Sequence, residues 1–237
     1  MNNQRVVILG GSQGIGLAVA QQAAKAGALV VIASSKRANV DRALESLPRG
    51  ATGAEVDLRS SPAIGRFFGN VGAFDHLVYT AGENLLLSPL NALDLDEARR
   101  FFELRFWSAI TAVKLARPHL RANGSIVLTG GSAAHRPGAG FVVGASICGA
   151  MESLTRALAI ELAPVRVNIV VPGFVETGLW NNIPADARAE MFRSAAAKLP
   201  VGRIGTPDDI AEHYLAFMRG GYTTGQSIIV DGGAVLS

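Results

Sequence analysis

Short, mainly apolar runs recur along the chain, and the longer segments between them have their apolar residues at helical spacing. Runs of this length, bounded by turn residues, are typical of buried strands in a parallel sheet. The pattern predicts seven strands, at residues 6–9, 28–33, 52–56, 74–79, 124–129, 165–171 and 226–230. Strands that alternate with helices require right-handed crossovers and give a sheet covered on both faces. We therefore expect one doubly wound α/β domain over residues 1–237, without linker or repeat.

The segments between the strands predict helices at about 40–47, 95–120 and 143–162, and another helix that opens at Pro207. The segment from 174 to 199 differs from these, because Pro172 and Gly173 break the sixth strand just before it. Its larger apolar residues are Leu179, Trp180, Ile183 and Met191. They fit either a mobile lid over a hydrophobic compound or an amphipathic helix packed on the domain.

A glycine-rich turn joins the first strand to the first helix. Glycines at 10, 14 and 16 let the backbone turn tightly, approach a ligand closely and seat the helix against the strand. The free N–H groups and the positive dipole end of that helix suit a phosphate. A turn in this position predicts a dinucleotide site, formed by Gly10, Ser12, Gln13, Gly14, Ile15 and Gly16.

The residues after the second predicted strand bear on which dinucleotide is bound. An NAD site places a carboxylate here for the ribose hydroxyl, whereas an NADP site places hydroxyls and cations around the 2′-phosphate. The first acidic residue of the chain is Asp41, so no carboxylate is available at this point. Ser34, Ser35, Lys36 and Arg37 favour NADP(H), although a solvated turn with helix-capping serines is the alternative.

Charge and composition exclude several other classes of protein. The net charge is only +3, and the basic residues are scattered rather than gathered in a stripe, which argues against a nucleic-acid surface. No apolar run reaches the ~20 residues of a membrane helix, and the chain enters its first strand without room for a signal peptide. A single cysteine, Cys148, excludes an internal disulfide. We expect a cytoplasmic protein without a metal, a membrane partner or a nucleic-acid partner.

Several further motifs accompany the glycine turn along nearly the whole chain. They are Asp57-Leu58, Tyr79-Thr80-Ala81-Gly82, Arg166-Val167-Asn168, Pro172-Gly173 with Thr177, residues 202–211, Thr224-Gly225-Gln226 and Asp231-Gly232-Gly233. Together they resemble the short-chain dehydrogenase/reductase family. The resemblance implies a Rossmann fold, a nicotinamide cofactor and a homo-oligomer, commonly a homotetramer and otherwise a dimer. It also implies cofactor contacts for Asp57, Leu58, Ala81, Gly82, Pro172, Gly173, Val175 and Thr177.

The catalytic half of the family pattern is missing from this sequence. The family uses a tyrosine as proton donor or acceptor, with a lysine four residues later that lowers the pKa of the phenol. The residues four places after the tyrosines at 79, 214 and 222 are Glu83, Met218 and Gln226. Alignment on the family's helix puts Gly144 at the tyrosine, Cys148 at the lysine, Gly131 at the serine and Arg105 at the asparagine. A shift of one residue would restore Ser132 as the serine.

Three residues are our candidates for the altered chemistry. The fixed guanidinium of Arg105 suits a carbonyl oxygen or a carboxylate, although an ion pair in packing or at an oligomer interface is equally compatible. Ser132 has a hydroxyl for a substrate oxygen, and His135, on the loop after the fifth strand, has an imidazole, the side-chain type most often used as a general acid. Glu83 is a weaker candidate acid, and Cys148 is expected to be a small buried helix residue.

These features leave three functions open. The first is an NADP(H)-dependent oxidoreductase that reduces a carbonyl or enone of a hydrophobic small molecule by an atypical proton path. The second is a non-redox isomerase or cyclase on the same scaffold, since glycine and cysteine in place of tyrosine and lysine enlarge the pocket. The third is a non-catalytic NADP(H)-binding protein. The frequency of reductases on this scaffold favours the first by analogy.

Overall fold

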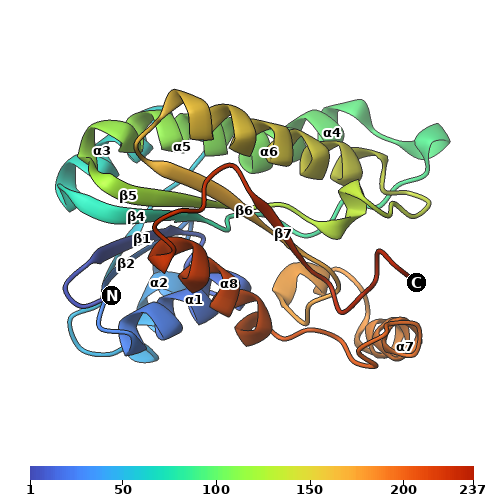
Figure 1. The fold of residues 1–237 in the computed structure, drawn as a ribbon. Helices are drawn as coiled ribbons and strands as arrows, with labels where there is room; N and C mark the ends of the chain where they lie inside the picture. The colour runs from blue at the N-terminus through green and yellow to red at the C-terminus, as the bar shows by residue number, and fades with distance from the viewer.

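Seven parallel strands form one sheet through the middle of the molecule in a computed structural model that describes residues 1–237 (Figure 1). The strands are β1 (Arg5–Leu9), β2 (Leu29–Ser34), β3 (Thr52–Glu55), β4 (Phe74–Tyr79), β5 (Leu120–Thr129), β6 (Arg166–Pro172) and β7 (Ser227–Val230). Their order in the sheet is β3-β2-β1-β4-β5-β6-β7. Every neighbouring pair is parallel. The predicted doubly wound, seven-stranded α/β fold is confirmed.

Helices cover both faces of this sheet. They are α1 (Gly14–Lys25), α2 (Arg37–Glu45), α3 (Ser61–Val71), α4 (Leu95–Phe102), α5 (Ser108–Ala116), α6 (Val142–Glu161), α7 (Ala185–Ala196) and α8 (Pro207–Arg219). One layer holds α3, α4, α5 and α6, and the other holds α1, α2 and α8 (Figure 1). The helix α7 lies apart from both layers, near the C-terminus. None of the helices is both long and apolar enough to cross a membrane.

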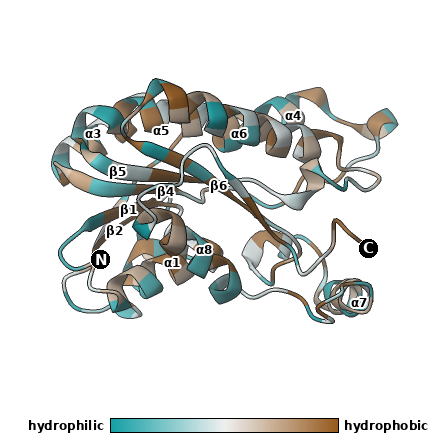
Figure 2. Cartoon of the chain, in the orientation of Figure 1, coloured by the Kyte–Doolittle hydropathy of each residue, from teal (hydrophilic) through white to brown (hydrophobic).

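Alternation along the strands divides the core into two parts. Val7 and Leu9 of β1 belong to a cluster of 27 buried residues on the α3–α6 side. Their neighbours Val6 and Ile8 belong to a second cluster, of 21 buried residues, on the α1–α8 side. Successive side chains of a strand point to opposite faces, so one apolar run supplies both clusters. In Figure 2 brown strand segments accordingly lie between two layers of helices that each carry both brown and teal residues.

The helix predicted over 95–120 is interrupted, and this expectation was wrong in detail. Between α4 and α5 the chain makes a wider turn, η2 (Glu103–Trp107), with the hydrogen-bonding pattern of a π-helix. The hydroxyl of the buried Tyr79 donates to the carbonyl oxygen of Leu104 in this turn, at 2.5 Å. A side-chain donor that engages a helix carbonyl favours such a local departure, and π turns are frequent at functional sites. The turn carries Arg105.

Other boundaries differ by a few residues. The helix predicted at 40–47 begins earlier, at Arg37, and the fifth strand starts at Leu120 rather than 124. The prediction that Pro207 opens a helix is confirmed. There Thr206 accepts from the backbone N–H of Asp209, and the Asp209 carboxylate accepts from that of Thr206. This reciprocal cap satisfies two backbone groups that a helix start leaves free.

The buried His76 of β4 makes stability depend on pH. Burial lowers its pKa from 6.5 to about 4, and the charge of Asp75 opposes this only in part. Between these two values the unfolded chain binds more protons, so stability is lost as pH falls from about 6.5 to about 4. We expect a loss of about 3 kcal/mol from this group, measured by urea unfolding at both pH values. His76→Gln should lose correspondingly less, and equal losses would contradict the assignment.

Candidate functional site

A cavity of about 700 Å³ opens at the carboxyl edge of the sheet. It lies where the strand order reverses, because β2 follows β1 along the chain on one side and β4 adjoins β1 on the other. Crevices at such a reversal are where open α/β sheets bind ligands. Residues from the ends of β1, β2, β4, β5 and β6 line this cavity, together with residues of α6, α7 and the C-terminal turn.

The glycine turn after β1 is packed too closely for side chains. Gly10 has a φ of +90°, and a Cβ on it would lie 2.6 Å from the backbone nitrogen of Ala81. A Cβ on Gly16 would overlap the carbonyl oxygen of Gly10 and reach 2.5 Å from Thr80 Oγ1. Glycine therefore allows α1 to begin directly against β1 and β4, as the sequence predicts.

The first turn of α1 leaves backbone donors free. The N-cap residue Gln13 makes no side-chain capping bond, and the first bonded amide is that of Leu17, which donates to Gln13 O at 3.2 Å. The amides of Gly14, Ile15 and Gly16 precede it on the cavity wall. Unpaired N–H groups at the positive end of a helix form an anion site. This cradle fits the phosphates of a dinucleotide.

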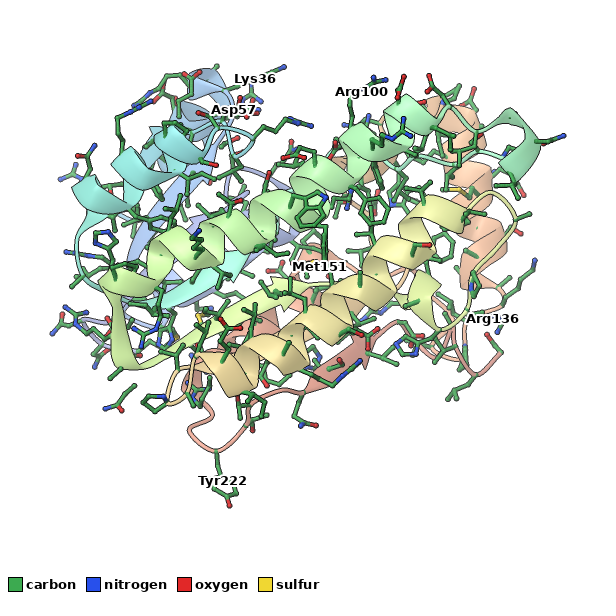
Figure 3. The ribbon with its side chains drawn as sticks, turned by 90° about the horizontal axis from the view of Figure 1, so that it is seen from above. Lys36, Asp57, Arg100, Arg136, Met151 and Tyr222 are labelled. Atoms are coloured by element: carbon green, nitrogen blue, oxygen red, sulfur yellow. The ribbon has the colours of Figure 1, made fainter.

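The adenosine end of the site agrees only partly with the sequence prediction. Ser34 and Ser35 line the cavity, and the Ser12 hydroxyl donates to that of Ser34 at 2.8 Å. Lys36 and Arg37 are exposed and lie outside the lining, and Arg37 pairs with Asp41. Figure 3 shows Lys36 at the same end of the molecule as Asp57.

The remaining predicted cofactor residues all line the cavity. They are Gly10, Ser12, Gln13, Gly14, Ile15, Gly16, Asp57, Leu58, Ala81, Gly82, Pro172, Gly173, Val175 and Thr177. Sequence reasoning missed Asn39, which lines the adenosine end from α2. The sequence feature that could have identified Asn39 is its position in the first turns of the helix after β2, two residues beyond Arg37.

Arg105 crosses the floor of the cavity from η2. Its guanidinium lies against Gly82, where a Cβ would be 2.8 Å from Arg105 Cζ, and 4.5 Å above the ring of Phe101. One of its terminal nitrogens donates to the carbonyl oxygen of Glu83. The Arg105 side chain keeps 21% exposure. Burial lowers its pKa from 12.5, the charge of Glu83 opposes this, and the group stays a cation at neutral pH.

Glu83 joins Arg105 to a second arginine. Its Oε1 accepts from Arg59 at 3.0 Å, and its Oε2 lies 3.9 Å from Arg105 Nε. All three residues line the cavity, but they come from the segments after β3, β4 and α4. The sequence offers no spacing that would have joined them. Because of these contacts, Glu83 is a stronger candidate site residue in the structure than it was from the sequence.

Open space lies at Gly144, the position that aligns with the family's tyrosine. A Cβ on Gly144 would meet nothing within 4 Å, and the nearby Cys148 Sγ lies 2.9 Å from where a Cβ of Gly131 would be. A side chamber of about 70 Å³ adjoins the main cavity here, lined by Gly144, Cys148 and Arg105 among others. Burial raises the pKa of Cys148 to about 11, and the nearby Arg105 opposes this only in part. The thiol is therefore no nucleophile at neutral pH.

The two loop candidates after β5 separate in the structure. Ser132 lines the cavity, whereas His135 does not. The His135 Nε2 is instead 2.8 Å from Oε1 of Glu152, a buried carboxylate on α6. The prediction that brought His135 to the site therefore finds no support in this geometry. The sequence did not predict this contact, because the position of Glu152 in its helix does not indicate that it faces His135.

The segment 174–199 lies over one end of the cavity. Leu179, Trp180 and Met191 line it, but Ile183 does not. Trp180 is buried, because its indole stacks on Phe174 at 5.4 Å and its N–H donates to Val175 O. The segment thus serves as a packed wall with its own small core. The helix α7 is present and three of the apolar residues face the cavity, while the role of the segment as a mobile lid stays a prediction.

The C-terminal turn forms the rim next to the end of the segment 174–199, where Gly232 and Gly233 lie against residues 199–201. Ala234 and Ser237 line the cavity, and Arg136 donates to the carbonyl oxygen of Ala234 at 2.8 Å. Figure 3 shows Arg136 at the end of the molecule near α7. Sequence analysis did not foresee this contact, because residues 136 and 234 are joined only by the fold.

Comparisons with known proteins agree with this geometry. Residues 10–235 match a family model described as enoyl-(acyl carrier protein) reductase. The chain is 34% identical to the short-chain dehydrogenase/reductase ATR9 of Stachybotrys chlorohalonatus (strain IBT 40285), and the match covers 100% of this chain and 98% of that protein.

Two solved structures are similar over their whole length. A small-chain dehydrogenase in complex with NADPH superposes with a TM-score of 0.88 at 33% identity and covers 100% of both chains. The MalC reductase/Diels-Alderase of Malbranchea aurantiaca superposes with a TM-score of 0.93 at 30% identity, over 100% of this chain and 98% of that one. By sequence, fold and the glycine turn at its cavity, this chain belongs to the short-chain dehydrogenase/reductase family of oxidoreductases.

Proposed function

We propose that this protein is an NADP(H)-dependent oxidoreductase that reduces a carbonyl or enone group of a hydrophobic small molecule by an atypical proton path. One observation carries the proposal. A single cavity connects the anion cradle of α1 to Arg105 and Ser132 and continues beneath the segment 174–199, where Leu179, Trp180 and Met191 line it. A dinucleotide and an apolar substrate thus have adjoining places in one space.

The chain's residues suit NADP(H) rather than NAD. The α1 amides meet the phosphates, and Ser34 and Ser35 offer hydroxyls where an NAD site has a carboxylate. Lys36 and Arg37 stand next to them in the chain as cations for a 2′-phosphate. The relative whose structure contains NADPH supports the same choice. When bound, the cofactor supplies the hydride of the reaction.

Arg105 is proposed to hold the substrate oxygen. Reduction of a carbonyl or an enone places negative charge on that oxygen, and a fixed cation in a partly closed site stabilises the charge as it forms. The guanidinium is held by Phe101, Gly82 and Glu83 before any substrate arrives. Ser132 is proposed to donate a hydrogen bond to the same oxygen. Gly144 stands in place of the family's tyrosine, so no phenol is present there to donate a hydrogen bond to the substrate oxygen.

A second candidate function is cyclisation or isomerisation of a bulky biosynthetic intermediate. The observation in its favour is the free volume around Gly144 and the 70 Å³ chamber, which admit a larger substrate than a tyrosine would. A relative described as both a reductase and a Diels-Alderase is 30% identical to this chain. In that case the shape and charge of the cavity would act on the substrate without net consumption of NADPH.

Titration of the purified protein with NADPH and with NADH tests the first proposal. We expect NADPH to bind at least about tenfold more tightly, since charge-assisted hydrogen bonds to a phosphate contribute more than about 1.4 kcal/mol. NADPH oxidation is then followed by fluorescence with 2-decalone, menadione and carvone, which represent ketones, quinones and enones. We expect consumption with at least one of them.

The outcomes separate the candidate functions. Consumption of one NADPH per molecule of product supports the reductase. Tight NADPH binding without consumption favours the cyclase or a non-catalytic NADP(H)-binding protein, and product analysis by mass spectrometry distinguishes these two. Absence of NADPH binding would contradict all three candidate functions, because each of them requires the glycine turn to bind NADP(H).

A further inference from the structure

Four cationic residues line the cavity, and two of them have no carboxylate partner. Arg59 and Arg105 share Glu83. The other two, Arg136 and Lys198, are exposed and take part in none of the ion pairs of the chain. Unpaired cations are ordinary on an open surface, but a cleft lined by charges of one sign attracts ions of the other. The rim with these two cations is therefore a candidate binding site for an anion.

Lys198 continues the side of α7 that faces the cavity. Met191, Ser194 and Ala195 line the cavity from this helix, and Lys198 follows them at spacings of seven, four and three residues. Residues at these spacings share one face of a helix. The backbone N–H of Lys198 donates to Ala195 O at 3.0 Å, so the helical course extends as far as this lysine. Its place in the cavity lining thus follows from the orientation of the whole helix.

Arg136 reaches the same rim from the turn after β5. Its Nη1 donates to Ala234 O at 2.8 Å, and its other two guanidinium nitrogens make no hydrogen bond within the chain. Gly233, just before Ala234, packs against Pro200, because a Cβ there would lie 2.5 Å from Pro200 Cγ. Pro200 is two residues beyond Lys198, and Figure 1 shows the C-terminal segment beside α7. The C-terminal turn thus holds one cation close to the segment that carries the other.

The other anions of the site have places of their own. Of the carboxylates in the lining, Glu83 is engaged by its two arginines, and Asp57 accepts from the backbone N–H of Arg59 after β3. The proposed contacts of the cofactor's 2′-phosphate follow β2, whereas Arg136 follows β5, and β1 and β4 lie between these strands. At a strand spacing of about 4.8 Å, the two strand ends are about 14 Å apart. The anion that suits Arg136 and Lys198 is then a group of the substrate.

We propose that the substrate is a hydrophobic carbonyl compound that also carries a carboxylate, which Arg136 and Lys198 hold at the rim. This inference rests on the proposed function and names its class of substrate. The planar fork of Arg136 matches a carboxylate, and the Lys198 ammonium adds a point charge. The apolar residues of the segment 174–199 accommodate the hydrocarbon part. By holding one end of the substrate, the two cations orient its carbonyl group toward Arg105.

Paired substrates with and without the charge test the proposal. In 9-oxodecanoate a ketone lies near one end of the chain and a carboxylate at the other, and its methyl ester is uncharged. We expect kcat/KM to be about 25-fold higher for the acid, because each of two exposed ion pairs contributes about fivefold. Raising NaCl from about 50 mM to about 500 mM should reduce this preference about threefold, since salt screens exposed charges.

Removal of each cation should lower the ratio of kcat/KM for acid and ester. We expect Lys198→Ala and Arg136→Gln each to lower it about fivefold, and the double variant to bring it close to one. The glutamine keeps an amide that can donate to Ala234 O, so the C-terminal turn stays in place. Arg193→Ala is the matched control, because it removes an exposed arginine of α7 that does not line the cavity. In the control the ratio should stay within about twofold of the wild type.

Binding of a compound without a ketone tests the site apart from turnover. Decanoate and decan-1-ol have the same chain length and differ in charge, and calorimetric titration into the NADP⁺ complex measures the Kd of each. We expect decanoate to bind at least about tenfold more tightly to the wild type. Lys198→Ala should weaken decanoate binding about fivefold, and Arg193→Ala should change it by less than about twofold.

The outcomes distinguish this inference from the proposed function. If the wild type reduces the ketones without a preference for the acid, or if the double variant keeps that preference, the inference fails while the reductase stands. A higher NADPH Kd in the double variant would assign the two cations to the cofactor and overturn the inference as well. If the wild type consumes no NADPH, the proposed function fails, and the titrations with decanoate alone decide whether Arg136 and Lys198 hold a carboxylate.

Discussion

Replacing Arg105 with alanine is expected to lower kcat about 1000-fold, because removal of one preorganised donor to a developing oxyanion costs 100- to 1000-fold. The loss falls on the chemical step, since Arg105 lines the substrate side of the cavity and not the α1 cradle. The NADPH Kd should therefore change by less than about threefold. Steady-state kinetics and a fluorescence titration of each variant measure the two effects separately.

Two further variants make the Arg105 result specific. Arg105→Lys keeps the charge but loses the planar fork, so it should recover only part of the rate. Arg100→Ala removes an exposed arginine of α4 that does not line the cavity and that Figure 3 shows at the edge of the molecule, and it should leave kcat unchanged. Loss of the oligomer or of NADPH binding in Arg105→Ala would instead assign this residue to packing or to an interface.

Gly16→Ala is expected to abolish NADPH binding and to destabilise the fold by about 3 kcal/mol, the upper part of the range for overpacked sites. The new methyl group would overlap Gly10 O and approach Thr80 Oγ1 to 2.5 Å, so α1 must move away from β1. That movement displaces the free amides at the start of the helix. Urea unfolding and an NADPH titration measure the two losses.

Gly65→Ala is the matched control for this prediction. Gly65 lies within α3, and a Cβ there would meet nothing within 4 Å. The alanine should stabilise the protein by about 0.5–1 kcal/mol, because glycine costs more conformational entropy in a helix. A Gly16→Ala protein with unchanged stability and NADPH affinity would show that α1 tolerates a shift, and the glycine would then have no packing role.

The architecture could be predicted because it depends on local patterns. The alternation that places Val7 and Val6 in different clusters is written into consecutive residues. The glycine turn combines a strand, three glycines and a helix within a dozen positions, and its packing needs follow from residue type alone. Pro207 after Thr206 marks a helix start in the same local way.

The predicted site was recovered to the extent that its residues stand at the ends of strands. Because parallel strands share one carboxyl edge, Gly82, Ser132 and Thr177 reach a common cavity whatever the details of packing. Lys36 and Arg37 depart from this rule, since they open α2, whose first turn directs Asn39 rather than these cations to the cavity. His135 departs from it because a carboxylate on α6 holds its ring.

Local residue patterns were thus enough to predict the fold class and the dinucleotide cradle and to reveal the absence of a tyrosine–lysine pair. Which charged groups meet depends on how the folded chain packs. Glu83 and Arg105 are 22 positions apart in sequence, and they meet because Tyr79 bonds the π turn that carries Arg105. Such contacts depend on how α4 packs against the sheet, and local propensity does not predict that packing.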